Sequence, residues 1–269
     1  MYSIERISEI LKILERDGRV EVNELASLFK ASRETIRRDL RDMEEKGLLQ
    51  RTHGGAVPGR AITSGKPEYP VAVREIQRVK EKNAICKSAA GFISNGDSIF
   101  VDNSSTCLYL LQYLPADMQI TLITNSVKLI LGSLESEHGN LTSICLGGFF
   151  NASNLSTYGN ISQRNAADFY PNRSFMSCAG IRLPDGLTDS SILEVDTKRL
   201  MIEHSQEVFI LADYTKFERT GPVFLSSFAS IDYLITDQSA RPDQYAALKE
   251  AGVEVITAQD ARDPASSTK

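Results

Sequence analysis

Two clusters of polar residues in this 269-residue chain have the types and spacing needed to bind anions. The first is the run SRETIRRDLR at positions 32–41, which carries four arginines. The second is DNSST at positions 102–106, where an aspartate and an asparagine precede three hydroxyl side chains. The planar guanidinium of arginine can donate two hydrogen bonds to a phosphate or to the edge of a guanine. Hydroxyl groups at a strand-to-helix turn can bind a small anion. The sequence therefore offers one surface suited to a nucleic acid and another suited to a small anionic molecule.

The arginine cluster lies on a predicted helix at residues 33–46, capped by Ser32 and ended by Gly47. Its helically spaced apolar residues, which face its own domain, are Ile36, Leu40 and Met43. Two helices are predicted before it, at residues 3–16 and from about Val22 with Asn23 as N-cap. After it, LLQRTHGGAV reads as two short extended segments around a turn. Three helices and a hairpin in under 60 residues outline a winged helix-turn-helix.

The charge distribution favours DNA over plain solvent as the partner of this helix. The net charge is −5, yet the first 60 residues carry 12 Lys and Arg against 11 Asp and Glu. The alternative is a solvated helix with ion pairs such as Arg38–Asp42 and Arg41–Glu45. The basic bias, the preceding helices and the glycine-tipped hairpin together favour a helix that enters the major groove.

The rest of the chain has a different pattern. The stretch at 57–70 has Pro, Gly and Ser and no periodicity, as interdomain linkers do. Beyond it, predicted helices near 72–93, 105–113, 126–134, 160–169 and 191–204 alternate with short apolar strands. We therefore expect a winged helix-turn-helix domain (3–57), a linker (58–71), a parallel-sheet α/β domain (72–257) and a flexible tail (258–269).

Several predicted strands end in small or polar residues: FVD-NSST, LIT-NS, CLGG, SCAGI and LAD-YTK. Open α/β sheets bind ligands outside the carboxyl ends of their strands, so these clusters should meet in one crevice. In the DNSST cluster, Ser104, Ser105 and Thr106 would donate to an anion and Asp102 would accept from a sugar hydroxyl. The alternative is an ordinary N-cap on a crossover helix.

Residues 3–57 resemble the DNA-binding domain of the DeoR-type bacterial repressors, through SRETIRRDL followed by GLLQRTHGGAV. The resemblance implies that the recognition helix and its wing face DNA, and we expect Asp39 to orient arginines. The residues concerned are Ser32, Arg33, Thr35, Arg37, Arg38, Arg51, His53, Gly54 and Gly55.

Residues 75–237 resemble the effector domain of the same family, which is similar in fold to ribose-5-phosphate isomerase and the glucosamine-6-phosphate deaminases. The matching stretches include GDSIFVDNSST, GLTDSSILEVDTKRLMI and LADYTKF. The family usually has glycine where this chain has Ser104, which suggests a different effector. The resemblance implies an effector site formed by Asp102, Ser104, Ser105, Thr106, Asn125, Gly147, Gly148, Glu194, Lys198, Asp213 and Lys216. For Gly147 and Gly148 the alternative is a strand-end turn, and for Lys198 an exposed helix position.

Composition excludes several other classes of protein. The four cysteines and three histidines are scattered, which predicts no disulfide framework, metal site or cofactor. No apolar run is long enough for a membrane span, and the charged N-terminus predicts a cytoplasmic protein.

These features predict a transcriptional repressor of a carbohydrate or sugar-acid operon. It would bind operator DNA as a homo-oligomer and be relieved by a phosphorylated sugar-like effector. One alternative is a sugar-phosphate isomerase or deaminase that uses Asp102, Glu194 or Asp213 as a base, although no matching catalytic cluster is recognisable. The other is an inert α/β domain that only oligomerises.

Overall fold

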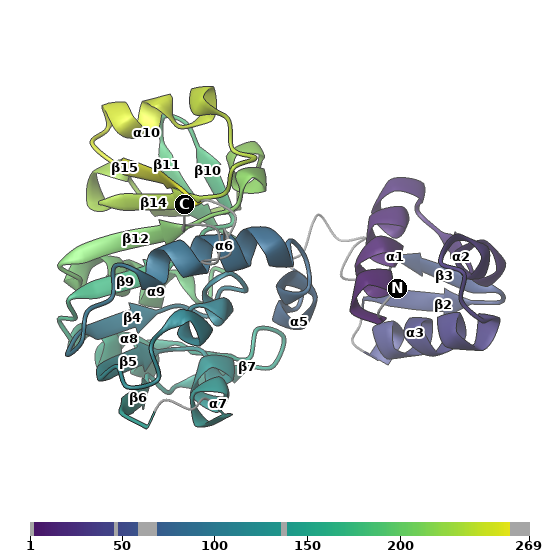
Figure 1. Cartoon of the computed structure of the whole chain (residues 1–269), viewed down its shortest axis with the longest axis horizontal. Helices are drawn as coiled ribbons and strands as arrows, with labels where there is room; N and C mark the ends of the chain where they lie inside the picture. Colours follow the sequence, from purple (N-terminus) through teal and green to yellow (C-terminus); the bar gives the residue numbers. More distant parts are fainter. Residues whose placement is uncertain (1–2, 46–47, 59–68, 136–138, 259–269) are drawn as a thin grey trace, which may run out of the picture. The chain divides into compact units, whose positions relative to one another are not determined.

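The computed structural model describes residues 3–45, 48–58, 69–135 and 139–258, and the chain divides into two compact units, residues 1–77 and 78–269 (Figure 1). The first unit extends beyond the predicted 3–57, because the helix α5 (Val71–Glu75) belongs to it and Val73 is part of its apolar core. Most of the predicted linker and tail, and Gly47, lie outside the described residues.

The N-terminal unit is the predicted winged helix-turn-helix. It contains α1 (Ser3–Asp17), α2 (Val22–Leu28), α3 (Arg33–Glu45) and the hairpin of β2 (Leu49–Thr52) and β3 (Gly55–Pro58). A two-residue strand that the sequence did not indicate, β1 (Val20–Glu21), pairs with β3 and gives the sheet order β1-β3-β2. Because this strand runs directly into α2, the N-cap is Glu21, and the predicted cap Asn23 lies inside the helix.

Helix α3 begins and packs as predicted. The backbone N–H of Thr35 donates to the hydroxyl of Ser32 at 3.1 Å, which caps the helix. Ile36, Leu40 and Met43 are at most 1% exposed and pack into the core of the unit.

A buried ion pair joins α3 to α1. Asp39 is 1% exposed, and its two carboxylate oxygens accept from Arg6 at 2.7 and 3.2 Å. Asp39 therefore orients an arginine, as expected, and this arginine is Arg6 of the first helix. A bidentate pair fixes both the distance and the angle between two helices.

The C-terminal unit is built on a seven-stranded parallel sheet of order β15-β14-β12-β9-β4-β5-β6. The strands in chain order are β4 (Ser98–Val101), β5 (Ile120–Thr124), β6 (Leu141–Cys145), β9 (Arg173–Met176), β12 (Glu207–Leu211), β14 (Tyr233–Thr236) and β15 (Glu254–Thr257). The chain builds one half of the sheet outward from β4 and the other outward from β9. The point where the strand order reverses is therefore the boundary between β4 and β9, where open α/β sheets bind ligands.

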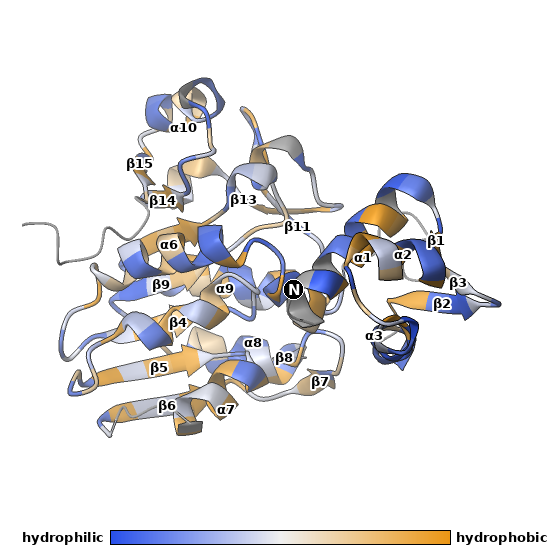
Figure 2. Ribbon diagram, turned by 45° about the vertical axis from the view of Figure 1, so that its right-hand side comes forward, coloured by the Kyte–Doolittle hydropathy of each residue, from blue (hydrophilic) through white to orange (hydrophobic). Residues whose placement is uncertain are grey.

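Apolar side chains cover both faces of this sheet, and the alternation along β4 shows it: Ile99 and Val101 face one layer, and Phe100 faces the other. Helix α6 (Val79–Ala90) packs on the first face; α8 (Asn160–Ala167), α9 (Val195–His204) and α10 (Ala246–Glu250) pack on the second. The central strands are mostly apolar in Figure 2, as strands buried on both faces must be. Helix α7 (Val127–Glu135) lies beside the edge strand β6.

Three details differ from the sequence-based expectations. The helix predicted at 72–93 is two helices, α5 and α6, and Arg78 between them has a left-handed backbone with φ of +52°. The helix predicted at 105–113 is a pair of short 3₁₀ turns, η1 (Cys107–Tyr109) and η2 (Leu111–Tyr113). Five short strands were not predicted: the hairpin of β7 (Phe149–Asn151) and β8 (Ser156–Tyr158), and a small sheet of β10 (Gly180–Arg182), β11 (Gly186–Asp189) and β13 (Val223–Ser226).

Replacing Arg6 by alanine should destabilise the N-terminal unit, because it removes the buried bidentate ion pair that joins α1 to α3. We expect a loss of about 3 kcal/mol in the free energy of unfolding, at the low end of what breaking a buried pair costs. Chemical denaturation of the full chain measures it. The matched control is Arg37→Ala, which removes an exposed pair with Glu34 at 3.6 Å and should change stability by less than about 1 kcal/mol. Equal effects of the two substitutions would contradict a structural role for the buried pair.

Candidate functional site

The first candidate site is the outer face of α3. Arg33, Arg37 and Arg38 are exposed, and Thr35 is half-buried at the start of the helix. Arg37 pairs with Glu34 at 3.6 Å, whereas the alternative pairs Arg38–Asp42 and Arg41–Glu45 are not among the ion pairs of the described residues. The arginines of this face can therefore turn to an external anion.

The wing continues this surface. Arg51 is exposed, and its backbone N–H donates to Glu44 of α3 at 2.8 Å, which ties the wing to the recognition helix. His53 and Gly54 are exposed at the turn, where Gly54 has a φ of +98°. Gly55 is different: it is buried, and a Cβ there would lie 2.0 Å from the carbonyl oxygen of Val20. The absence of a side chain at Gly55 thus permits β3 to pair with β1. This pairing within the unit explains the glycine without any contact to DNA.

The second candidate site lies where β4 and β9 end. Asp102 follows β4 directly and is fully buried. One of its carboxylate oxygens accepts from the backbone N–H of Ser104 at 3.0 Å, and the other from that of Ser177, just past β9, at 3.1 Å. Asp102 therefore shapes the DNSST loop and fastens it to the neighbouring strand.

Lys198 of α9 is buried in the middle of this junction. Its ammonium lies 3.0 Å from Asp102 and 2.6 Å from Asp189 at the end of β11, and it donates to the carbonyl oxygen of Ser177 at 2.6 Å. Burial lowers the pKa of Lys198, but the attraction of Asp189 and Asp102 outweighs it and raises that pKa above its usual value. Burial alone would raise the pKa of Asp189, but the positive charge of Lys198 outweighs this effect, and the pKa of Asp189 lies below its usual value. Lys198 is therefore an internal cross-link and not an exposed helix residue.

Two hydroxyls and one backbone carbonyl of the DNSST loop contact the elements beside it, η1 and α6. Ser104 Oγ accepts from the backbone N–H of Cys107 at 3.3 Å. Ser105 Oγ accepts from the ammonium of Lys82 on α6 at 3.1 Å. The Cys86 thiol, one turn further along α6, donates to the carbonyl oxygen of Thr106 at 3.1 Å. Since only a short 3₁₀ turn follows the loop, side chains must supply most of the attraction for an anion.

The carboxylate of Glu194, which precedes α9, accepts hydrogen bonds from side-chain amides and a hydroxyl rather than from a cation. It accepts from Asn103 at 3.0 Å, from Asn151 at 2.9 Å, from Asn154 at 3.1 Å and from Ser156 at 2.5 Å. The carboxylate therefore joins the loop after β4 to the β7–β8 hairpin.

Asn125, at the end of β5, belongs to the same network. Its side-chain N–H donates to the side-chain oxygen Oδ1 of Asn103 at 3.2 Å. Its own side-chain oxygen is buried and has no hydrogen-bond partner among the described residues. Buried polar atoms nearly always have a hydrogen-bond partner, so a buried acceptor of this kind calls for an explanation.

Asp213 and Lys216 lie at the end of β12. Asp213 caps the turn η3 (Tyr214–Glu218) through the backbone N–H of Thr215 at 3.0 Å, and it lies 3.7 Å from Arg78. Burial raises the pKa of Asp213, but Lys216, Thr215 and Arg78 together lower it below its usual value. Burial also raises the pKa of Cys178, just past β9, to about 12, and the charges acting on this thiol include Lys216, Lys198, Asp189 and Asp213. The ends of β9, β11 and β12 are therefore one electrostatic neighbourhood.

Gly147 and Gly148 have positive φ angles of +69° and +110° after the edge strand β6. A Cβ on Gly148 would lie 2.5 Å from the carbonyl oxygen of Tyr158. Gly148 therefore packs against the β7–β8 hairpin, and this packing agrees with the alternative in which the two glycines form a turn at the end of the strand.

Both units match known protein families. Residues 6–59 match the DeoR-like helix-turn-helix domain, and residues 77–238 match the DeoR C-terminal sensor domain. The HTH-type regulator YulB of Bacillus subtilis is 34% identical over 95% of this chain and 96% of its own. The chain belongs to the DeoR family of transcriptional regulators. The family relationship confirms the prediction of a regulator rather than an enzyme.

Other relatives of this DeoR-family chain carry names from sugar metabolism. The L-fucose operon activator of Haemophilus influenzae is 33% identical over 86% of this chain and 90% of its own. Among solved structures, the sorbitol operon regulator SorC of Klebsiella pneumoniae matches with a TM-score of 0.42 and 11% identity, covering 92% of this chain and 99% of its own. A ribose 5-phosphate isomerase of Methanocaldococcus jannaschii matches with a TM-score of 0.36 and 12% identity, covering 50% and 52%.

In the DeoR sensor domain, Asp102 directly contacts two other predicted residues, Ser104 and Lys198. Asn125 and Glu194 are linked to each other through Asn103. Sequence reasoning missed Arg78, Lys82, Asn103, Ser177 and Asp189. Lys82 carried a signal: it occupies the apolar stripe of its helix together with Ile85, Cys86 and Ala89. A lysine in such a stripe needs an internal partner.

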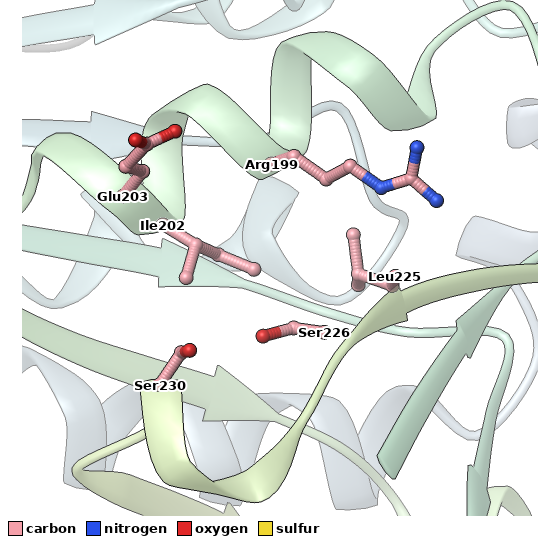
Figure 3. A pocket seen from close by; sticks show the side chains of 6 residues that line it. All are labelled: Arg199, Ile202, Glu203, Leu225, Ser226 and Ser230. Atoms are coloured by element: carbon pink, nitrogen blue, oxygen red, sulfur yellow. The ribbon is translucent and has the colours of Figure 1, made fainter.

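A hollow elsewhere in the sensor domain takes in none of the predicted residues. Figure 3 shows it between α9 and the β13 region, lined by Arg199, Ile202, Glu203, Leu225, Ser226 and Ser230. Its one cation, Arg199, already bonds Asp196 at 2.8 Å and the carbonyl oxygen of Phe224.

Within the described part of the chain, no group of three or more His, Cys, Asp or Glu side chains is placed to hold a metal ion. No helix in that part is long and apolar enough to cross a membrane.

Replacing Lys198 by methionine should destabilise the sensor domain by about 3–5 kcal/mol, because Asp102 and Asp189 would remain buried without their cation. The pH dependence should also change. In the native protein the lowered pKa of Asp189 gives stability that is present above about pH 4 and is lost as pH falls through the folded pKa. In the variant, burial is the largest remaining influence on this pKa, and it opposes the two hydrogen bonds from the backbone N–H groups of Ser190 and Ser191. We expect burial to prevail and to raise the pKa, so the free energy of unfolding should fall as pH rises above about 4.

Urea denaturation of the full chain from pH 4 to 8 measures both effects. The control is Lys87→Met, which removes an exposed lysine from α6. A variant with the wild-type pH profile would show that Lys198 does not set the ionisation of Asp189.

Proposed function

We propose that this DeoR-family regulator represses a carbohydrate or sugar-acid operon and that a phosphorylated sugar-like effector relieves the repression. The observation that carries the proposal is the polar junction at the reversal of strand order between β4 and β9. The same chain also contains a winged helix-turn-helix with an exposed, arginine-rich recognition helix.

The DNA contact would be made by α3 and the wing. The exposed forks of Arg33, Arg37 and Arg38 suit phosphates and guanine edges in the major groove. Ser32 and Thr35 stand at the N-terminus of the 13-residue α3, where backbone N–H groups favour a DNA phosphate. Arg51, His53 and Gly54 would bring the wing close to the backbone. Gly55 contributes indirectly, by holding the wing against β1.

The effector would enter the crevice at the DNSST loop. Ser104, Ser105 and Thr106 supply hydroxyl groups, and the unpartnered oxygen of Asn125 suits a ligand hydroxyl. Lys216, half-buried beside Asp213, supplies positive charge at the end of β12. Asp102, Glu194 and Lys198 would act by holding the loops in place, since each already has internal partners. Gly147 and Gly148 would shape the rim of the crevice.

The name of one relative, the L-fucose operon activator of Haemophilus influenzae, supports a carbohydrate-derived ligand. Because this relative is an activator, the direction of regulation needs its own measurement. Repression relieved by ligand requires that the effector prefer the state with low affinity for DNA.

Paired operator half-sites would need at least a dimer, because one winged helix buries little surface on DNA. The sensor domain is the larger unit and the more suitable one for contacts between copies. We place the regulator in the cytoplasm, with double-stranded operator DNA and a small anionic effector as its partners.

Arg37→Ala should weaken operator binding by about 1–3 kcal/mol if this fork reads a base, with relaxed preference at one position. The operator is first selected by the wild-type protein from random duplexes, and affinities are then compared by fluorescence anisotropy at fixed salt. Lys249→Met, an exposed charge on the sensor domain, is the control. Unchanged affinity and preference would remove Arg37 from the interface.

The effector site is tested by thermal shift of the wild-type full chain with a panel of sugar phosphates, sugar acids and free sugars. At a ligand concentration 100 times Kd we expect a stabilisation of about 2.7 kcal/mol by at least one phosphorylated compound, together with release of DNA. The double variant Ser105→Ala, Thr106→Ala should still bind operator but lose the shift and the release, whereas Ser94→Ala should keep both. Turnover of a panel compound would favour an enzyme, and no shift from any compound would favour an inert domain.

A further inference from the structure

One side of the sensor domain, formed by β6, α7, the β7–β8 hairpin and the start of α8, exposes apolar side chains to solvent. These elements are neighbours: α7 contacts β6 and β8, and β8 pairs with β7 and contacts α8. Both Figure 1 and Figure 2 show β6, α7 and β7 together on the lower side of the domain. We call this region the edge surface, and its large exposed apolar residues are Leu131, Leu134, Phe149, Phe150 and Ile161.

The edge surface contains very little charge. The 25 residues 139–163, which run from β6 through the hairpin into α8, include no Asp, Glu, Lys or Arg, in a chain of which 24% is charged. Helix α7 adds Lys128 and Glu135 alone. Surfaces that stay in water normally carry charges of both signs, whereas the centre of a protein interface has few charges and many aromatic residues. The composition of the edge surface is therefore that of an interface.

Strand β6 also leaves a sheet edge open on this side. It is the last strand of the parallel sheet, and no strand of the described residues pairs with its outer edge. Proteins commonly protect a free edge with charged residues or proline. The sequence of β6, LTSIC, has neither, whereas β15 at the opposite edge carries Glu254. The edge at β6 thus has the properties of an edge that another protein covers.

A second copy of this chain fits the edge surface better than a partner of another kind. DNA requires cations, and the segment 139–163 supplies none. The net charge of the chain is −5, so two copies repel each other, and a surface without charge adds least to this repulsion. A twofold dimer uses the same patch on both copies, and an apolar patch is complementary to itself.

We propose that two copies of the regulator bind each other through the edge surface, around a twofold axis. The proposal rests on the proposed function in one respect, because paired operator half-sites require at least a dimer. The hairpin of the edge surface also carries Asn151, which donates to Glu194 at 2.9 Å. The contact between copies would therefore share the β7–β8 hairpin with the proposed effector site.

The interface is tested by sedimentation velocity of the full chain over a range of concentrations, without effector or operator. Wild type should form at least a dimer, and the double variant Leu134→Asp, Phe150→Asp should raise the dissociation constant of the dimer at least about tenfold, because like charges then face each other. The matched control is Phe224→Asp on β13, since Phe224 is 52% exposed and Phe150 is 54% exposed. This control should keep the wild-type dissociation constant.

A charge-reversed variant tests whether the edge surface binds the same surface of a second copy. The double variant Leu134→Lys, Phe150→Lys should dissociate as the aspartate variant does. An equimolar mixture of the two variants should associate more tightly than either variant alone, because opposite charges then face each other. Loss of folding in the variants would not produce this recovery.

Three outcomes would overturn the proposal. An aspartate variant that dimerises as tightly as wild type would do so and would leave the proposed regulatory function intact. Two variants that dissociate but do not associate with each other would show that the edge surface does not bind its own counterpart. A wild type that is monomeric at every concentration would overturn both this interface and the model of paired half-sites.

Discussion

The geometry of the sensor domain depends on one buried ammonium, that of Lys198. The ends of β4, β9 and β11 and the first turn of α9 meet around this ammonium. The contacts that join them to it are made by Asp102, Ser177 and Asp189. These elements come from distant parts of the chain, and no apolar contact could fix their relative positions so closely, because apolar packing has no direction. Charge-assisted hydrogen bonds do have direction. The same carboxylate that bonds Lys198 also accepts from Ser104, so the conformation of the DNSST loop follows from the position of α9.

A second carboxylate, Glu194, extends this arrangement without any cation. Glu194 and Lys198 are one turn apart, and the N–H of Lys198 donates to the carbonyl oxygen of Glu194 at 3.2 Å. The start of α9 thus faces two clusters, one ionic and one of amides and a hydroxyl. Through Asn103 and Asn151, the second cluster ties the loop after β4 and the β7–β8 hairpin to the start of the same helix. A ligand that shifts the DNSST loop must therefore disturb several hydrogen bonds together, which is how a small molecule can favour one discrete arrangement over another.

The sequence was sufficient for the elements that obey a simple period or cap. Ile36, Leu40 and Met43 predicted α3, and the apolar runs predicted the seven parallel strands, because both patterns are local. It was insufficient where distant residues decide: strands of two to four residues such as β1 and β10 form only against a partner, and the helix at 105–113 is reduced to 3₁₀ turns in its packed setting. For the site, strand-end polarity found Asp102 and the cluster that contains Asn125, and the family resemblance found Glu194 and Lys198. The roles of these residues came from partners such as Asp189 and Ser177 that no spacing rule connects to them. Lys82 could have been found, since a lysine in an apolar helical stripe is visible in the sequence.

The engagement of the carboxylates gives a physical reason why a fold of this type can bind a ligand without transforming it. A general base needs a carboxylate oxygen directed at the substrate, with a pKa suited to proton transfer. Asp102 has both oxygens occupied by backbone N–H groups and by Lys198. Glu194 accepts from four side chains, and Asp213 has a lowered pKa and caps a turn. Each carboxylate that could have served as a base is thus committed to holding a loop. In the proposed effector site, the groups left to meet a ligand would be hydroxyls, an amide oxygen and lysines, which would recognise an anion and its hydroxyls, and the free energy of binding would then be available to shift the conformation.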